Sequence, residues 1–423
     1  MTELFLHYVW QYQLYNRDDF YTTHNEPIRV KQIGTYNTDA GPDFTNAHIY
    51  IDNTLWVGDI EIHVNAHDWH SHKHSKNSAY NSVILHVVFV ADSEVTNAYG
   101  NTIPTAVLSI PEHIIETYTH ILKMPTQHHC IYNLETINGI YKSQWFDTLV
   151  VERFEEKTAT IIARLIPNNN DWEHTLYGSL AANFGFKTNS LAFEKLAQSI
   201  NFKYFAKHKN SLLQIESLLF GNANLFPSNQ IDSYTQERIH EYLFLQKKYR
   251  LSPIPKELWK FARLRPANFP TIRIAQFAQL LFQSQNLCSH ILECKTIQDY
   301  TSLFTIQLNE YWNTHYMLSQ EAPFKVKNMG IDSIYTILIN TVTPFLFAYG
   351  KYRNHHELCT KALDFLEQLP SEKNTIVSEW NKHGISSFSA FRSQALLQLS
   401  NKYCKNKRCL QCAFAHKIFT IKQ

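Results

Sequence analysis

Two strand-forming runs near the start of the chain limit its possible folds more than any other part of the sequence. Residues 54–64, TLWVGDIEIHV, end in alternating apolar and polar residues, and residues 83–90, VILHVVFV, are apolar almost throughout. Successive side chains of a strand point to opposite faces, so the first run predicts a strand with one apolar and one polar face. The second run predicts a central strand that is covered on both sides.

The remainder of the first hundred residues is typical of a compact mixed sheet with a helix. Apolar residues between Glu3 and Tyr15 have nearly helical spacing, which predicts a short opening helix. Ile28–Ile33 alternates apolar and basic residues, as a half-exposed strand does, and Ala47–Ile51 predicts a further strand. We therefore expect an α/β domain over residues 1–125.

Beyond residue 125 the apolar period changes from two to about three and a half, which predicts a mostly α-helical region over residues 126–423. This region ends in a cysteine-rich segment, residues 404–416. The predicted fold class is α+β or α/β, with a mixed sheet first and helices after it. The main apolar stripes lie in residues 235–249, 274–285, 297–318, 331–349, 356–369 and 388–399.

Composition restricts the classes of function. With 44% hydrophobic and 18% charged residues, the 423-residue chain is globular and long enough for more than one domain. Its formal net charge of +2 is nearly neutral, so any binding to nucleic acid has to rely on a local basic patch.

Three features favour a cytoplasmic protein with no membrane partner. The start of the chain lacks a basic segment followed by a small-residue cleavage site, so no secretory signal is expected. The longest apolar run, residues 331–349, contains Asp332, Asn340 and Pro344, which predicts a buried core helix. The odd number of cysteines, seven, favours a metal or cluster site over a disulfide framework.

The candidate catalytic residues lie on the two predicted strands 47–51 and 54–64 or next to them. Asp43 stands at the head of one strand and Glu61 near the end of the next, and the two meet if the strands pair through a turn at Asp52–Asn53. Carboxylate oxygens bind Mg²⁺ and Mn²⁺, so this pair predicts a divalent-cation site, with His63 on the same face as Glu61. The alternative is that Asp43 only ends a turn and Glu61 is a solvated strand residue.

A dense group of histidines supports a second hypothesis, a zinc-dependent hydrolase that uses some of them with Asp68. No HExxH-like spacing is present, and most of these histidines fall in a polar loop where surface positions are expected. His86 differs, because it interrupts an apolar strand and needs a partner there. It either faces the Asp43 and Glu61 pair or is a satisfied core histidine. The group comprises His63, His67, His70, His72, His74 and His86.

Two further clusters point to ligands. Cys404, Cys409 and Cys412 follow the spacing C-x4-C-x2-C, and zinc would bind them with His416. An iron–sulfur cluster would instead bind the three with a remote fourth cysteine, for which Cys130 is the candidate. Arginines around a proline turn suit phosphate oxygens or nucleic acid, or else pair with helix carboxylates. These arginines are Arg263, Arg265 and Arg273.

The first hundred residues resemble the PD-(D/E)xK nuclease superfamily, through Pro42-Asp43 and through Glu61-Ile62-His63 in place of the (D/E)xK element. The resemblance implies a restriction-endonuclease-like fold and metal-dependent cleavage of DNA. Asp43 and Glu61 would bind the metal with the Ile62 carbonyl, and His63 would take the position of the lysine. Some recombination and CRISPR-associated nucleases of this superfamily join the two ends of the chain with an iron–sulfur cluster.

Nearly the whole chain resembles a bacterial family known only as a domain of unknown function. The segments that carry this likeness are 41–44, 68–72, 83–88, 264–276, 339–350 and the C-terminal cysteines. This second resemblance implies no activity, but it implies that the sheet and the helical region belong to one type of protein.

Three functions follow as hypotheses. The first is a Mg²⁺- or Mn²⁺-dependent phosphodiesterase acting on DNA, with Asp43, Glu61 and His63 as its catalytic residues. The second is a catalytically inactive nucleic-acid or protein interaction module on the same fold, and the third is the zinc hydrolase. Oligomeric state stays open. Supporting candidates for the first site are Asp59, His67, Asp68 and His86.

Overall fold

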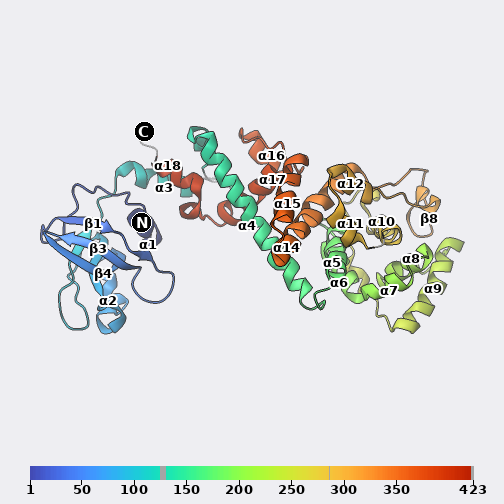
Figure 1. Ribbon diagram of the computed structural model, residues 1–423, viewed down its shortest axis with the longest axis horizontal. Helices are drawn as coiled ribbons and strands as arrows, with labels where there is room; N and C mark the ends of the chain where they lie inside the picture. Colours follow the sequence, from blue (N-terminus) through green and yellow to red (C-terminus); the bar gives the residue numbers. More distant parts are fainter. Residues whose placement is uncertain (124–129, 285, 421–423) are drawn as a thin grey trace. The chain divides into compact units, whose positions relative to one another are not determined.

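The structure is a computed structural model that describes residues 1–123, 130–284 and 286–420 (Figure 1). The chain forms two compact units, one of Met1–Trp145 with Ser400–Gln423 and one of Phe146–Leu399. This division differs from the expected boundary after residue 125, which left the cysteine-rich segment with the helices. The segment joins the first unit because helix α18 (Ala413–Thr420) packs against helix α3 (Glu112–Lys123) and the 3₁₀ turn η3 (Ile131–Thr136).

A mixed sheet forms the centre of the first unit, as the sequence predicts. Its first three long strands are antiparallel, and the last two strands run parallel to the third. A further short strand, β2 (Thr35–Tyr36), also pairs with β3 (Phe44–Ile51). In spatial order the strands are β1 (Ile28–Gln32), β3 (Phe44–Ile51), β4 (Thr54–Asn65), β5 (Val83–Val90) and β6 (Thr105–Val107).

The predicted hairpin between β3 and β4 is present. Ile51 pairs with Thr54, and Asp52 takes a left-handed φ of 51° that closes the turn between them. A bulge interrupts the pairing between Phe44 and Ala47. The parallel connection from β4 to β5 consists of α2 (Asp68–Ser71), η1 (His74–Lys76) and η2 (Ser78–Tyr80).

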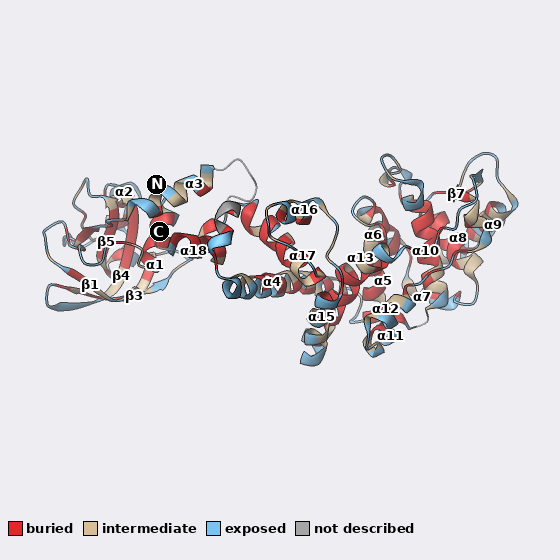
Figure 2. Ribbon diagram, turned by 90° about the horizontal axis from the view of Figure 1, so that it is seen from above, coloured by how far each residue is buried: buried red, intermediate tan, exposed pale blue. Residues whose placement is uncertain are grey.

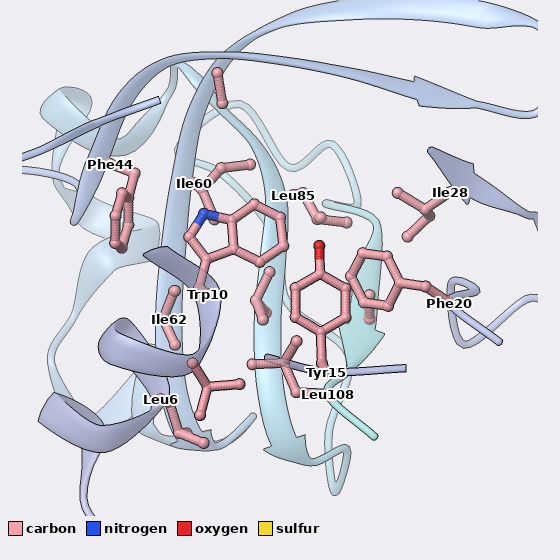
Figure 3. Close-up of a cluster of buried hydrophobic side chains, with 14 of the residues drawn as sticks. Leu6, Trp10, Tyr15, Phe20, Ile28, Phe44, Ile60, Ile62, Leu85 and Leu108 are labelled. Atoms are coloured by element: carbon pink, nitrogen blue, oxygen red, sulfur yellow. The ribbon is translucent and has the colours of Figure 1, made fainter. Parts of the chain in front are cut away.

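The opening helix α1 (Glu3–Gln11) covers one face of the sheet. Its buried side chains include Leu6 and Trp10, and the Trp10 ring lies among Ile60, Ile62 and Leu85 of the central strands (Figure 3). Removing each such side chain from water contributes about 1.5–3 kcal/mol, which fixes the helix on the sheet. The Thr2 hydroxyl caps the helix by accepting from the Phe5 amide.

The opposite face of β4 is also covered, although it carries polar residues. Trp69, Tyr80 and Val83 form a second, smaller buried cluster with residues of the loop that follows β5. Glu61 and His63 lie on this face and are only 4% and 1% exposed. The β4 strand is therefore buried on both sides at its centre.

The second unit is helical, with buried residues concentrated on helices such as α8 and α10 (Figure 2). Helix α4 (Gly139–Leu165) leads into it. The helices that follow are α5 (Trp172–Phe184), α6 (Ser190–Ser199), α7 (Phe202–Lys207), α8 (Leu212–Asn222), α9 (Ser233–Tyr249), α10 (Pro270–Gln283), α11 (Leu287–Glu293), α12 (Ile297–Leu303), α13 (Ile331–Ile337), α14 (Thr343–Arg353), α15 (His356–Gln368), α16 (Thr375–Lys382) and α17 (Ala390–Gln398).

One helical stripe was predicted too long. The stripe over residues 297–318 forms a helix only as far as Leu303, and a β-hairpin of β7 (His315–Met317) and β8 (Gln320–Glu321) follows. The reason is a change of period, because Phe304, Ile306 and Leu308 are buried while the residues between them are exposed. That alternation is typical of extended chain.

The apolar segment Ile331–Arg353 is long and apolar enough to cross a membrane, but 67% of its most apolar window is buried inside the structure. It comprises α13, a π-helical turn η7 (Leu338–Val342) and α14. Core helices of soluble proteins have this degree of burial. The finding agrees with the core helix that the polar residues of this segment predict.

Trp10→Ala tests whether α1 is held by its packing on the sheet. We expect the loss of burial and the cavity left behind to lower the free energy of unfolding of the first unit by about 3–5 kcal/mol. Leu4→Ala on the same helix is the matched control, since Leu4 is 53% exposed. Hydrogen exchange of peptides from β4 and β5 in the full-length protein measures the change, and equal effects of the two substitutions would contradict this packing.

Candidate metal centre

The β3–β4 hairpin brings Asp43 and Glu61 together at the end of β3. The Asp43 amide donates to Glu61 Oε2 at 3.2 Å, and the Ile62 amide donates to Asp43 Oδ2 at 2.9 Å. The two carboxylates therefore lie side by side on neighbouring strands, as the turn at Asp52–Asn53 allows.

Three histidines come together beside the buried Glu61 carboxylate. One ring nitrogen from each lies within 4.8 Å of the others, and the three are His63 on β4, His72 after α2 and His74 in η1. Glu61 Oε1 is 3.5 Å from His63 Nε2 and 3.3 Å from His74 Nε2. Strand and loop thus place three imidazoles together, and two of them contact the Glu61 carboxylate.

A second ligand group adjoins the first. Glu3 and His7 of α1 meet Asp43, with one ligand atom from each within 4.8 Å of the others. His7 Nε2 lies 3.2 Å from Asp43 Oδ2, and Glu3 Oε1 lies 4.0 Å from His63 Nε2. The two groups are therefore close enough to form one binuclear centre.

Sequence reasoning missed Glu3 and His7. Their spacing of four residues places them on one face of α1, and this is the signal that was available. Nothing in the sequence alone indicates that this face lies beside Asp43.

The carboxylates of the centre are electrostatically strained without a cation. Burial and the neighbouring Asp43 raise the pKa of Glu61 from 4.5 to about 9. Burial and Asp43 also raise the pKa of Glu3. Ionising these buried carboxylates is therefore unfavourable in the metal-free protein. A bound cation would favour the ionised form of each carboxylate and so offset this effect.

The histidines are suited to bind a cation in their neutral form. Burial, together with the neighbouring imidazoles, lowers the pKa of His63 to about 2 and that of His86 to about 3. Nε2 of His7 and Nε2 of His74 are buried without a hydrogen-bond partner, although each is close to a carboxylate oxygen. Nitrogens of this kind, beside carboxylates, fit the coordination of a transition-metal ion.

His86 positions His63 from the neighbouring strand. His86 Nε2 lies 2.8 Å from His63 Nδ1, so His86 faces the centre and is not an isolated core residue. A proton on His63 Nδ1 would be donated to His86 and would leave Nε2 free for a metal, as metal-bound histidines usually require. On the other side of the centre, Tyr80 stacks on the His74 ring at 3.8 Å between centroids.

The centre opens toward solvent at His72, the exposed member of the three histidines. Lys73 and Lys76 follow on the same loop and are also exposed. Lys73 has a left-handed φ of 62°, which reverses the chain between α2 and η1. A positively charged loop therefore borders the accessible side of the centre.

The other candidates near this site make local hydrogen bonds. Asp59 accepts from a backbone amide of the β3 bulge and from a serine hydroxyl, at 3.0 and 2.6 Å. His67 pairs with Asp92 at 2.5 Å, and Asp68 accepts from the Asn65 amide at 3.1 Å. These contacts stabilise the strand ends and the turn before α2.

The three arginines are not gathered at one phosphate-sized site. Arg263 and Arg265 are exposed. Arg273 is buried in the second unit, where it donates to Asn268 at 2.7 Å and Gln276 at 2.9 Å. It also donates to the Ser333 hydroxyl at 3.2 Å, and its guanidinium lies 4.3 Å from the centre of the Phe186 ring.

The predicted cysteines come together within the first unit. Cys130, Cys404, Cys409 and Cys412 are all buried. Burial raises the pKa of the Cys404 thiol, and the other three thiols raise it further. His416 is instead engaged with Tyr8, whose hydroxyl lies 2.7 Å from His416 Nδ1. Cys130 thus interacts electrostatically with the three C-terminal thiols, and a role for His416 as the fourth ligand stays a prediction.

The fold and site define an α+β protein with a candidate metal centre at the middle of its sheet. Residues 3–375, most of the chain, match the family described as Protein of unknown function (DUF2851), and the chain belongs to that family. No curated protein matches the chain, and no solved structure matches it. The family assignment agrees with the full-length resemblance, while the nuclease-like resemblance of the first hundred residues is not confirmed.

The pKa of Glu61 predicts a pH-dependent stability in the metal-free protein. Its folded-state pKa of about 9 lies above its ordinary value of 4.5, so the contribution of this group to stability is greatest below pH 4.5. That contribution is lost as the pH rises toward 9. We therefore expect Glu61→Gln to raise the melting temperature of chelator-treated protein at pH 8, and to raise it less at pH 5.

Adding Zn²⁺ or Mn²⁺ at pH 8 should make the melting temperature of the wild type higher than that of Glu61→Gln, because only the wild type retains the carboxylate ligand. Asp59→Asn is the control, since Asp59 lies on the same strand but outside the two ligand groups. Differential scanning calorimetry measures both effects. A Glu61→Gln protein that is less stable than the wild type at pH 8 without metal would contradict the assigned strain.

Proposed function

We propose that the first unit is a metal-dependent phosphodiesterase that acts on DNA. The observation that carries the proposal is the pair of adjoining ligand groups, one of three histidines and one of Glu3, His7 and Asp43, on either side of Glu61. Two neighbouring cations can stabilise both the attacking and the leaving oxygen of a phosphodiester. Asp43 and Glu61 also stand on paired strands, where the nuclease resemblance expects its metal ligands.

The donor atoms favour Mn²⁺ or Zn²⁺ over Mg²⁺. Mg²⁺ prefers oxygen ligands and retains its waters, whereas imidazole nitrogen suits transition-metal ions. A bound cation would polarise a phosphoryl oxygen and lower the pKa of a coordinated water. The three-histidine group would hold one cation with Glu61, and the group around Asp43 would hold the other.

His63 differs in role from the lysine whose position it takes. A lysine brings a fixed positive charge, but the pKa of His63 is lowered to about 2 by burial and by the other histidines, so its ring is neutral. A neutral ring of such low basicity serves better as a ligand than as a general base. We assign the positive charge near the scissile phosphate to the exposed loop of Lys73 and Lys76.

The three-histidine group also favours one alternative, a zinc-dependent hydrolase whose substrate is not a phosphodiester. The same residues would then bind a single zinc ion, and Asp43 would contribute little. A cytoplasmic location belongs to either proposal and accords with the free state of all the cysteines.

Cleavage assays test the phosphodiesterase. Asp43→Asn, Glu61→Gln and His74→Ala should each lower Mn²⁺- or Zn²⁺-dependent cleavage of single- or double-stranded DNA by at least about 100-fold, since each removes a ligand. His67→Ala is the matched control, because His67 is exposed and pairs with Asp92 outside the two groups. A small diester such as bis(p-nitrophenyl) phosphate reports on the same chemistry without a requirement for DNA binding.

The results separate the alternatives. Cleavage that survives all three substitutions would exclude this centre as the active site. Hydrolysis of carboxylic esters with zinc, lost in His74→Ala but retained in Asp43→Asn, would support the alternative hydrolase. DNA binding with no cleavage in the presence of either Mn²⁺ or Zn²⁺ would indicate an inactive interaction module.

A further inference from the structure

Four buried thiols from distant parts of the sequence meet in the first unit. Cys130 precedes η3, Cys404 ends a π-helical turn η8 (Leu399–Cys404), and Cys409 begins the 3₁₀ turn η9 (Cys409–Gln411). Cys412 follows directly, before α18. They are 6–9% exposed and form no disulfide. Helix α18, which begins just after Cys412, packs against η3, which begins just after Cys130. The Cys412 amide donates to the Cys409 carbonyl at 3.0 Å, and the Lys407 amide donates to the Cys404 carbonyl at 3.1 Å. The four thiols therefore lie in one region of the first unit.

The spacing of the sulfur atoms is wider than a single zinc ion requires. Zn–S bonds of about 2.3 Å place the sulfurs of a tetrahedral site about 3.8 Å apart. Among the residues that the structure describes, the groups of ligand atoms within 4.8 Å of one another contain histidine and carboxylate only, and no cysteine. No three of the four sulfurs therefore lie as close together as the ligands of one zinc ion.

Hydrogen-bond donors lie around the Cys412 sulfur. Burial raises the pKa of the Cys412 thiol to about 11, but the backbone amides of Ala415 and Phe414, at the start of α18, and the Trp145 side chain act against this rise. The Trp145 indole nitrogen is itself buried. These donors would stabilise a metal-bound thiolate at Cys412.

We infer that Cys130, Cys404, Cys409 and Cys412 bind an iron–sulfur cluster. The spacing C-x4-C-x2-C with a remote fourth cysteine is one known to hold such clusters. Each thiol loses its proton to solvent as its sulfur binds iron. Lys407 lies beside Cys409 and offsets part of the thiolate charge.

The cluster has a structural consequence for the candidate metal centre. It fastens residues 400–420 to the chain segment at Cys130, and the α18 helix that begins just after Cys412 contacts α1 through Tyr8 and His416. Phe419 adds a ring contact with Tyr8, at 5.7 Å between centroids. Because α1 carries Glu3 and His7, the cluster stabilises the helix that completes the second ligand group.

Metal and sulfide analysis of the full-length protein, purified without oxygen, tests the inference directly. We expect a brown protein with two or four iron atoms per chain, an equal amount of acid-labile sulfide, and broad absorbance near 400 nm, values typical of such clusters. Cys409→Ser and Cys130→Ser should each lose most of the iron and sulfide. Cys288→Ser is the matched control, because Cys288 is an equally buried free cysteine in α11 of the second unit.

Several outcomes would overturn the inference. One is a colourless protein that takes up neither iron nor sulfide when Fe²⁺ and sulfide are added under reducing conditions. Another is one zinc ion per chain, lost in Cys409→Ser, which would show a single-ion site. Loss of iron in His416→Ala but not in Cys130→Ser would show that His416, and not Cys130, is the fourth ligand. His74→Ala should keep its colour, so this test is independent of phosphodiesterase activity.

Discussion

The burial of Glu61 and His63 at the centre of β4 is the constraint on which the first unit depends. The strand pairs with β3 on one side, antiparallel, and with β5 on the other, parallel. One of its faces packs against the apolar core that contains Trp10, and the other face carries the polar centre. A register slip of one residue would turn Glu61 toward the apolar core and Ile60 toward the histidines. The fold therefore gains its register from the same alternation that places the ligands, and site and sheet cannot be altered independently.

The cost of this arrangement is electrostatic, and it indicates what the site is built to bind. A carboxylate whose pKa is raised to about 9 by burial and by Asp43, next to imidazoles kept neutral by burial, leaves the metal-free protein short of positive charge at one point. In a scaffold selected only for stability, apolar side chains would fill this volume at lower cost. The bound cation that we propose would offset this cost.

Much of the sheet was predictable because its signals are local. Alternation gave the strands, and the turn at Asp52–Asn53 gave the hairpin that unites Asp43 with Glu61. His72 and His74 were both expected at the surface, and His72 is indeed exposed. His74 is buried, because its ring packs against Trp69 and Tyr80, and loop position alone does not reveal this. Glu3 and His7 were missed since their role depends on how α1 docks, and the stripe after Leu303 failed because a helical and an extended pattern overlap there.

The first unit is discontinuous, since residues 146–399 are inserted between its two parts. During synthesis, α1 and the sheet leave the ribosome long before α18 does, so the Tyr8 contact with His416 forms only after the whole helical unit has been made. Until then α1 lacks part of its packing, and the ligands Glu3 and His7 are less firmly placed. The order of translation thus delays the full packing of α1, which carries Glu3 and His7, until the helical unit has been made.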